Sequence, residues 1–229
     1  MTFRLPITLA LLISTNLIFA EGMKQYEVSV TNITKGQTFT PLLVATHSDA
    51  ASLFTLGQPA SDSLALLAEA GNTDALTAEI LNFPNEIGHV KTIPGLLGPG
   101  ETVSFEIKGH HKHYMLTVAA MLLPSNDTFI ALSSAGLPNK GSASYMARAY
   151  DAGTEANDQL CIHIPGPLCG GEADSATSDT DEGYVYVSNG IHDMGDLDPA
   201  TYGWHNPIAL ITIKAMHKNE GKKQETHKH

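Results

Sequence analysis

Apolar and polar residues alternate in the first strand-like part of the chain. Over residues 26–31, Tyr26, Val28 and Val30 alternate with polar side chains, and this period of two is typical of a strand with one buried face. Similar strand patterns occur at residues 102–107, 114–123, 128–132, 183–188 and 208–216. Because strands come from both ends of the chain, with turns rich in Gly, Pro and Asn between them, the sequence predicts an all-β fold, an antiparallel β-sandwich.

One segment departs from the strand pattern. Residues 61–81 begin with Ser61, which can cap a helix, and Leu64 and Leu67 then recur at helical spacing before Gly71. A second short helical turn is expected near the end of the segment. The sequence therefore predicts short helical insertions between strands, with their leucines packed on the edge of the sandwich.

The N-terminal segment is typical of a secretory signal peptide. Arg4 precedes an apolar run over residues 5–19, and small Ala20 offers a cleavage point. The alternative is an uncleaved membrane anchor, but the run is shorter than the ~20 residues that span a bilayer. We therefore expect a signal peptide at residues 1–20 and a secreted, periplasmic or cell-surface protein, with no transmembrane segment after cleavage.

The rest of the chain is long enough for one β-sandwich, because all-β domains can run to ~200 residues as a single unit. We expect one domain at residues 21–217, followed by a disordered polar tail rich in His and Lys at residues 218–229. The formal net charge of -11 argues against a nucleic-acid partner, whose phosphates would be repelled. The same charge is compatible with cation binding.

Cys161 and Cys169 are the two cysteines of the chain. An even number of cysteines in a secreted protein suggests that they form a disulfide. Closing so short a ring would contribute about 2–3 kcal/mol in the loop-entropy model. The alternative, a pair of thiolate metal ligands, is disfavoured in an oxidising compartment.

Three carboxylates lie in loops without a matching nucleophile or general base. Asp127, Asp151 and Glu155 are hard oxygen donors in loops rich in Gly, Asn and Ser, and calcium takes carboxylate and carbonyl oxygens as ligands. The alternative is ordinary turn chemistry, because Asp and Asn favour loops in any protein. The pattern favours cation binding over catalysis.

Four parts of the chain carry a family resemblance. They are residues 30–47, with VTNIT, QTFTP and ATH; residues 119–127, with AAMLL before Asn-Asp; residues 151–155, DAGTE; and residues 182–207, with EGYV, NGIH, GDLD and WHNP. In this order they resemble the spondin N-terminal domain in its bacterial form, over residues 26 to 214.

The resemblance implies a β-sandwich that is similar in shape to calcium-dependent phospholipid-binding domains. Animal members of the family bind calcium through acidic loop residues, and the matching positions here are Asp127, Asp151 and Glu155. Glu155 stands where the family has Asp, and a Glu often binds calcium through both oxygens. The resemblance thus implies a secreted, non-catalytic binding module that is stabilised by calcium as its cofactor and presents its loops to an extracellular or cell-surface ligand.

Histidines offer an alternative based on copper. His111 and His113 would face the same side of a strand and could share one ion, and His47 and His192 lie in the family motifs. Neutral imidazole suits copper, zinc or nickel. The competing interpretation is a solvated edge, with Lys108 among the histidines. On the copper hypothesis, the protein scavenges or delivers the metal in the periplasm or at the cell surface.

A second, looser resemblance bears on this alternative. Secreted copper-binding proteins of methane-oxidising bacteria are similar to this broader group, and they hold copper with two histidines and an oxidised tryptophan. Trp204 is the single tryptophan here, with His205 beside it. Neighbouring residues of a strand point to opposite faces, so we expect Trp204 to be a core residue instead.

No catalytic motif supports an enzyme. The sequence has no Gly-x-Ser-x-Gly elbow, no His-Glu-x-x-His helix and no phosphate-binding glycine loop. The sequence therefore predicts a protein that is not an enzyme.

Overall fold

The computed structural model describes residues 22–174 and 181–216 and confirms the all-β fold, which is an antiparallel sandwich with short helices. The predicted signal peptide and the predicted tail lie outside the described residues. The strands are β1 (Lys24–Asn32), β2 (Thr38–Phe39), β3 (Leu42–His47), β4 (Ile87–Ile93), β5 (Thr102–Gly109), β6 (Met115–Leu123), β7 (Thr128–Gly136), β8 (Ser142–Asp151), β9 (Tyr186–Val187) and β10 (Ala209–Ala215).

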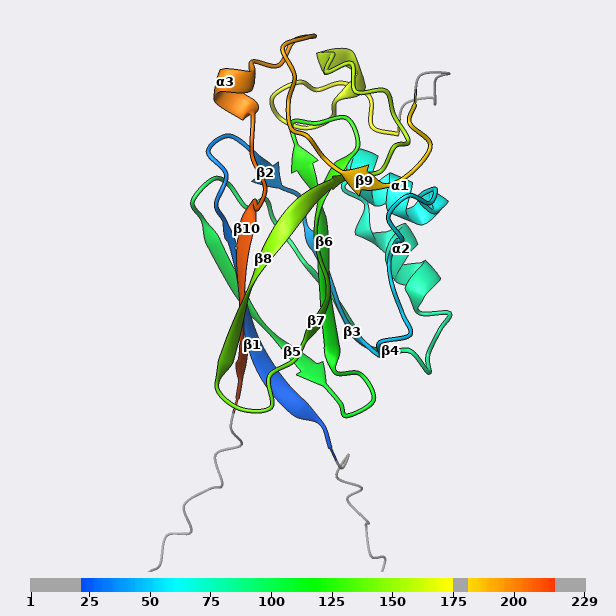
Figure 1. Ribbon diagram of the computed structural model, residues 1–229, viewed down its shortest axis with the longest axis vertical. Coiled ribbons are helices and arrows are strands. Elements are labelled where there is room, and N and C mark those ends of the chain that lie inside the picture. Colours follow the sequence, from blue (N-terminus) through cyan, green and yellow to red (C-terminus); the bar gives the residue numbers. More distant parts are fainter. Residues whose placement is uncertain (1–21, 175–180, 217–229) are drawn as a thin grey trace, which may run out of the picture.

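The strands form one hydrogen-bonded path that folds over on itself. Its order is β4-β3-β6-β7-β8-β10-β1-β5, with β2 paired to β6 and β9 paired to β8. Strands β1, β5 and β10 form one layer, and β3, β4, β6 and β7 form the other, as Figure 1 shows. The two ends of the path approach each other: the Thr46 hydroxyl on β3, next to the end strand β4, donates to the Lys108 carbonyl on β5, 2.9 Å away. The main core lies between the layers.

Strand β6 is buried on both faces. Val118 and Ala120 belong to the core between the layers, whereas Ala119 belongs to a second apolar cluster with Leu64 and Leu67. A strand covered on both faces reads as a continuous apolar run instead of an alternating one. This explains the sequence MLTVAAMLL of β6.

The helices cover the outer face of the second layer, beside β6 in Figure 1. They are α1 (Asp62–Ala70) and α2 (Thr73–Ile80), and a short α3 (Pro199–Tyr202) lies at the end of the sandwich. The Ser61 hydroxyl accepts the backbone N–H of Leu64, and Gly71 ends α1 in the left-handed conformation, with φ of 64°. These helix boundaries confirm the predicted insertion.

Two details of that insertion differ from the expectation. Asn72 is the N-cap of α2, so the second helix begins directly after the first. The helix leucines pack against Phe129 and Ala131 on the face of β7, and not on the edge of the sandwich. The leucines can pack on this face because its residues from β6 and β7, Ala119, Phe129 and Ala131, are small or apolar.

The strand predictions are partly correct. The strands expected at both chain ends, β1 and β10, are present. The strand expected at residues 183–188 is reduced to the two residues of β9. In the described residues, no helix is long and apolar enough to cross a membrane.

The packing of α1 generates a stability prediction. Leu67 is fully buried between α1 and the sheet, so Leu67→Ala should lower the free energy of unfolding by about 2–5 kcal/mol. Urea unfolding measures the loss. Leu81→Ala removes the same atoms from a side chain that is 54% exposed and should change stability by less than ~0.5 kcal/mol. Equal losses in the two variants would contradict the helix packing.

Candidate metal centre

Strand pairing brings two of the three predicted carboxylates together. Asp127 ends the loop that follows β6, and Asp151 is the last residue of β8. In the β7–β8 pair, Thr128 lies opposite Asp151, and the backbone N–H of Ala152 donates to the Asp127 carbonyl at 3.2 Å. The two aspartates are therefore neighbours across the end of the sheet.

The turn after Asp151 brings Glu155 to the same place. Gly153 has a φ of 68°, and a Cβ there would lie 2.4 Å from the Tyr184 carbonyl oxygen, so only glycine fits this position. The turn aims two backbone N–H groups, those of Thr154 and Glu155, at Asp127 Oδ2, at 2.8 and 3.1 Å. The predicted ligands Asp127, Asp151 and Glu155 thus come from one compact region.

Only one of the two carboxylate oxygens of Asp127 accepts hydrogen bonds from the described residues. Its Oδ2 accepts the two N–H groups and the Thr154 hydroxyl. Its Oδ1 is buried and, among the residues that the structure describes, has no hydrogen-bond partner. A buried carboxylate oxygen without a partner carries a desolvation cost, and this cost marks the position as one where a cation would be stabilised.

Asp151 lies in a polar environment that the sequence did not predict. Its Oδ1 accepts the Gly153 N–H at 3.0 Å, and its Oδ2 accepts the Asn157 side-chain amide at 2.9 Å. The same amide donates to Glu182, and the Tyr186 hydroxyl donates to Glu182 as well. We call Asp127, Asp151, Glu155 and Glu182 the acidic cluster. Glu182 and Tyr186 could be found only from the pairing of β9 with β8, which the sequence does not reveal.

Burial and mutual repulsion make the acidic cluster resist ionisation. Burial raises the pKa of Asp151 to about 8, with the charge of Asp127 as the next cause. Burial likewise raises the pKa of Asp127 to about 6, against the hydrogen bonds from residues 154 and 155 that favour its charged form. Nearby on α1, burial raises the pKa of Glu69 to about 7. The pKa of Tyr186 is also raised, by burial and then by the charge of Asp151.

The charges of the two aspartates are not balanced by basic side chains. In the described residues, neither Asp127 nor Asp151 forms an ion pair with Lys or Arg, and the ion pair that is present joins His163 to Asp158. No three His, Cys, Asp or Glu side chains of this part of the chain are arranged to hold a metal ion by themselves. A cation here would need amide, backbone or water oxygens beside the carboxylates, and calcium accepts such mixed shells. The oxygen donors of this region are of the type that calcium takes as ligands.

The structure does not bring the predicted copper ligands together. His47 lies opposite Met115 at the start of β6, whereas the backbone N–H of His192 donates to Gln159, in the loops beyond the far end of β6. Strand β6 spans roughly 25 Å at ~3.3 Å per residue. One ion therefore cannot take His47 and His192 in this arrangement.

The other histidines occupy a turn instead of a strand. His110 and His113 form an isolated bridge, so His111 lies in the tight turn between them, and the expected strand geometry of His111 and His113 is wrong. Gly109 ends β5 directly before this turn. The rings of His110 and His111 lie 3.9 Å apart between centroids, and His113 Nε2 lies 3.0 Å from the Asn85 carbonyl.

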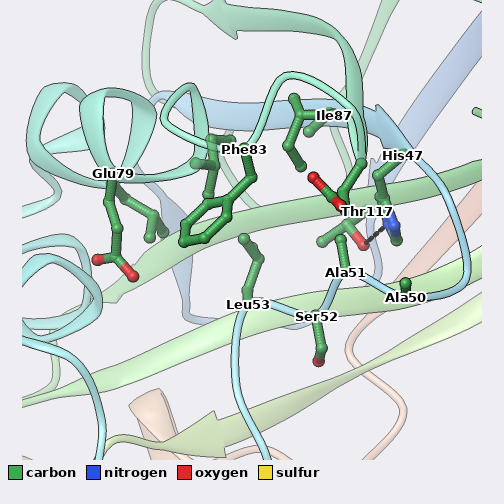
Figure 2. Close-up of a pocket in the computed structure, with 13 residues that line it drawn as sticks. His47, Ala50, Ala51, Ser52, Leu53, Glu79, Phe83, Ile87 and Thr117 are labelled. Carbon is green, nitrogen blue, oxygen red and sulfur yellow. Dashed lines mark hydrogen bonds between the residues drawn. The ribbon is translucent and has the colours of Figure 1, made fainter.

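Both ring nitrogens of His47 are engaged. Its Nδ1 lies 2.7 Å from the Ser48 carbonyl. Its Nε2 lies 2.7 Å from the Thr117 hydroxyl, the bond that Figure 2 shows. Because a carbonyl only accepts, Nδ1 carries the proton, and Nε2 accepts from Thr117. Burial lowers the pKa of His47, in agreement with a neutral ring. Trp204 is a core residue, as expected, with 7% of its surface exposed.

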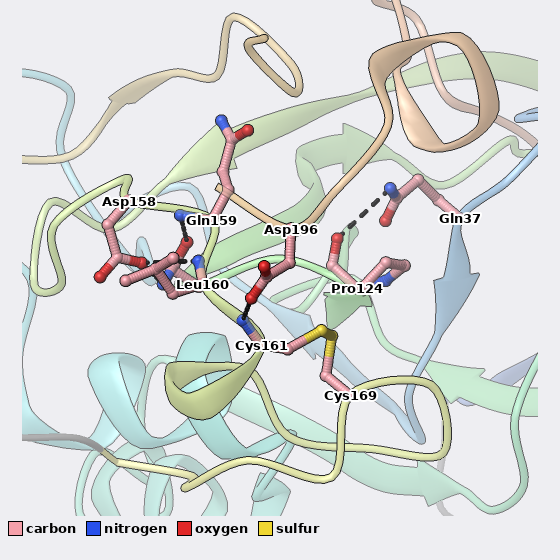
Figure 3. The surroundings of a disulfide bond; sticks show 9 residues. Gln37, Pro124, Asp158, Gln159, Leu160, Cys161, Cys169 and Asp196 are labelled. Carbon is pink, nitrogen blue, oxygen red and sulfur yellow. Dashed lines mark hydrogen bonds between the residues drawn. A yellow bond between two sulfur atoms is a disulfide. The ribbon is translucent and has the colours of Figure 1, made fainter. Parts of the chain in front are cut away.

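The predicted disulfide between Cys161 and Cys169 is confirmed. It closes a loop that is fixed to its neighbours, as Figure 3 shows: the Cys161 N–H donates to the Asp196 carboxylate at 2.9 Å, and the Asp196 N–H donates to the Gln159 carbonyl at 2.9 Å. The Gln159 N–H donates in turn to the Asn126 side chain, next to Asp127. The disulfide loop and the acidic cluster therefore share one supporting framework.

The family model described as Spondin_N matches residues 23–159, and this family supports the role of an extracellular binding module. The chain therefore belongs to the spondin N-terminal domain family, which confirms the resemblance seen in its sequence motifs. This family is generally non-catalytic. The match includes Asp127, Asp151 and Glu155. No match was found among curated proteins.

The raised pKa values predict how stability depends on pH in the absence of metal. The folded chain keeps its protons on Asp151 and Asp127 to higher pH than the unfolded chain, whose Asp pKa is about 3.9. The folded state therefore binds more protons between about pH 4 and pH 8, and the free energy of unfolding should fall as the pH rises through this window. Urea unfolding in chelator at several pH values measures the slope.

A variant without one of these carboxyls isolates their effect. Asp151→Asn should flatten the pH dependence, whereas Glu27→Gln, on strand β1, should leave it unchanged. A free energy of unfolding that rises from pH 5 to pH 8 in chelator would contradict the raised pKa values.

Proposed function

We propose that this protein is a secreted, calcium-stabilised binding module that presents the loops at one end of its sandwich to an extracellular or cell-surface ligand. The observation that carries the proposal is the buried Oδ1 of Asp127, which has no hydrogen-bond partner in the described residues. It lies within a group of carboxylates whose pKa values are raised by burial. Such a group is stabilised by a bound cation.

The chemistry of the cluster favours calcium over softer metals. Asp127, Asp151 and Glu155 offer oxygen donors, and the loop around them adds amide and backbone oxygens of the kind that complete a calcium shell. Thiolates are absent from the region because both cysteines form the disulfide. A calcium ion would neutralise the negative charge of these carboxylates. The Asp127 carboxylate also fixes the position of the following turn, because it accepts the N–H groups of Thr154 and Glu155.

The ion would act on the loops that surround it. Residues 151–160 connect β8 to the disulfide loop and hold Asp127, Asn126 and Asp196 through hydrogen bonds. Fixing this segment in one conformation reduces the entropy cost of presenting its neighbours to a partner. The calcium thus serves the binding surface without taking part in a reaction.

A copper-binding role has less support. His47 uses both ring nitrogens within the protein, and His192 lies at the other end of β6. Elemental analysis of protein purified without an affinity tag separates the alternatives, since calcium and copper are measured at once. Copper that remains after dialysis, in place of calcium, would favour the histidine hypothesis.

Calcium should raise the melting temperature relative to chelator. At free calcium about 100-fold above its dissociation constant, binding to the folded state alone adds about 2.7 kcal/mol, which corresponds to roughly 5–10 °C for a chain of this size. Asp151→Asn should remove most of the shift, because it deletes one charge and keeps the shape. Glu27→Gln, distant on β1, should retain it. Equal melting temperatures of the wild type at saturating calcium and in chelator would exclude the site.

The disulfide should contribute to the same site. Replacing both cysteines, Cys161→Ser and Cys169→Ser, should lower the free energy of unfolding by about 2–3 kcal/mol in the loop-entropy model. It should also weaken calcium binding, since the disulfide loop is connected to Asn126 and Asp196 beside the cluster. Calcium titration of the two proteins measures the second effect. An unchanged calcium affinity in the double variant would mean that the disulfide stabilises its own loop alone.

A further inference from the structure

A cavity of about 210 Å³ lies between α2 and the loop that follows β3 (Figure 2). Leu53, Ile80 and Phe83 form apolar walls, and His47 and Thr117 lie at its inner end. None of the residues of the acidic cluster lines it. The cavity is therefore separate from the proposed calcium site.

The polar groups at the inner end are already engaged. His47 donates through Nδ1 to the Ser48 carbonyl and accepts through Nε2 from Thr117. The Thr117 hydroxyl also accepts the Ser134 N–H at 3.1 Å. These bonds leave no strong donor or acceptor directed at an occupant. The interior of the cavity is thus suited to an apolar group.

Negative charge lies around the same cavity. Glu79 and Glu86 both line it, and in the described residues neither forms an ion pair with Lys or Arg. Glu79 accepts hydrogen bonds from the Ser61 and Ser63 hydroxyls, which leave its charge in place. Apolar walls with two carboxylates complement a molecule that has an apolar body and a cationic head.

The volume limits the size of that molecule. An apolar cavity of about 150 Å³ holds benzene, so about 210 Å³ accommodates an apolar group of roughly six or seven carbon atoms. We propose that this cavity binds a small organic cation, a chain or ring of about six carbons that carries a primary ammonium group, with the ammonium facing a glutamate carboxylate, Glu79 or Glu86, of the lining. This site goes beyond the proposed calcium-binding role and does not depend on it.

Three probes of equal chain length test the proposal on the full chain. Isothermal titration with hexylammonium, 1-hexanol and hexanoate should give saturable one-to-one binding of hexylammonium. Hexanol lacks the charge and should bind about two- to tenfold more weakly than hexylammonium, the size of a partly exposed charge pair. Hexanoate carries the opposite charge and should bind more weakly still. The result should be the same in calcium and in chelator, so failure here is distinguishable from failure of the calcium site. No saturable binding, or hexanoate binding as tight as hexylammonium, would overturn the proposal.

Charge variants test the role of the two glutamates. In the double variant Glu79→Gln, Glu86→Gln, hexylammonium should bind with the same affinity as hexanol, because the carboxylate charges are removed. A matched control, Glu27→Gln with Glu106→Gln, makes the same charge change on the β1–β5 pair and should keep the preference for ammonium. If both double variants keep it, the assignment of the head group is wrong.

A filling variant tests the location. Ala51 lines the cavity, so Ala51→Leu should weaken hexylammonium binding at least tenfold while the melting temperature confirms a folded protein. Ala78→Leu adds the same atoms to an exposed position of α2 and should bind as the wild type does. If Ala51→Leu does not fold, Ala50→Leu, at another lining position, takes its place. Unchanged binding in a folded filling variant would place the amine elsewhere and refute the proposal.

Discussion

The structure depends on strand β6 being buried on both faces. One face contributes to the core between the two layers, and the other is covered by α1. The apolar surface removed from water on both sides is a large favourable contribution for so short a segment. Because β6 is fixed in this way, its two ends are fixed as well. Thr117, near one end, forms part of a cavity, and the loop after the other end carries Asp127. The two candidate sites are therefore held by one strand at a distance from each other.

The acidic cluster is maintained at a cost that other parts of the fold offset. Its carboxylates are close together and partly removed from water, so each opposes the ionisation of the others. The Asp127 Oδ2 atom recovers part of this cost through backbone N–H groups. The remainder is opposed by apolar packing around β6 and β7, and it would be reduced by a cation. Strain of this electrostatic kind often accompanies a binding site.

The sequence predicts those features whose signals are local. The alternation around Val28, the cap at Ser61 and the left-handed Gly71 each act within a few residues, and their structures agree with the expectation. The strands β3 and β8 were not predicted, since β3 is apolar without alternation and β8 is rich in Ser and Ala. The position of Glu182 beside Asp151 was not predictable either, because it depends on the pairing of β9 with β8. The turn at His111 was not predicted, although Gly109 precedes it, because its His and Lys residues are not typical of turns.

Strand β10 comes last among the described strands, yet it lies inside the sheet. It pairs with β8 on one side and with β1 on the other, so the first and last strands of the domain are direct neighbours. The family match ends at residue 159, fifty residues before β10 begins at Ala209. A chain that stopped at the end of the match would expose the edges of β1 and β8, two unpaired edges that favour aggregation. During synthesis, the sheet can therefore close only after nearly the whole domain has left the ribosome.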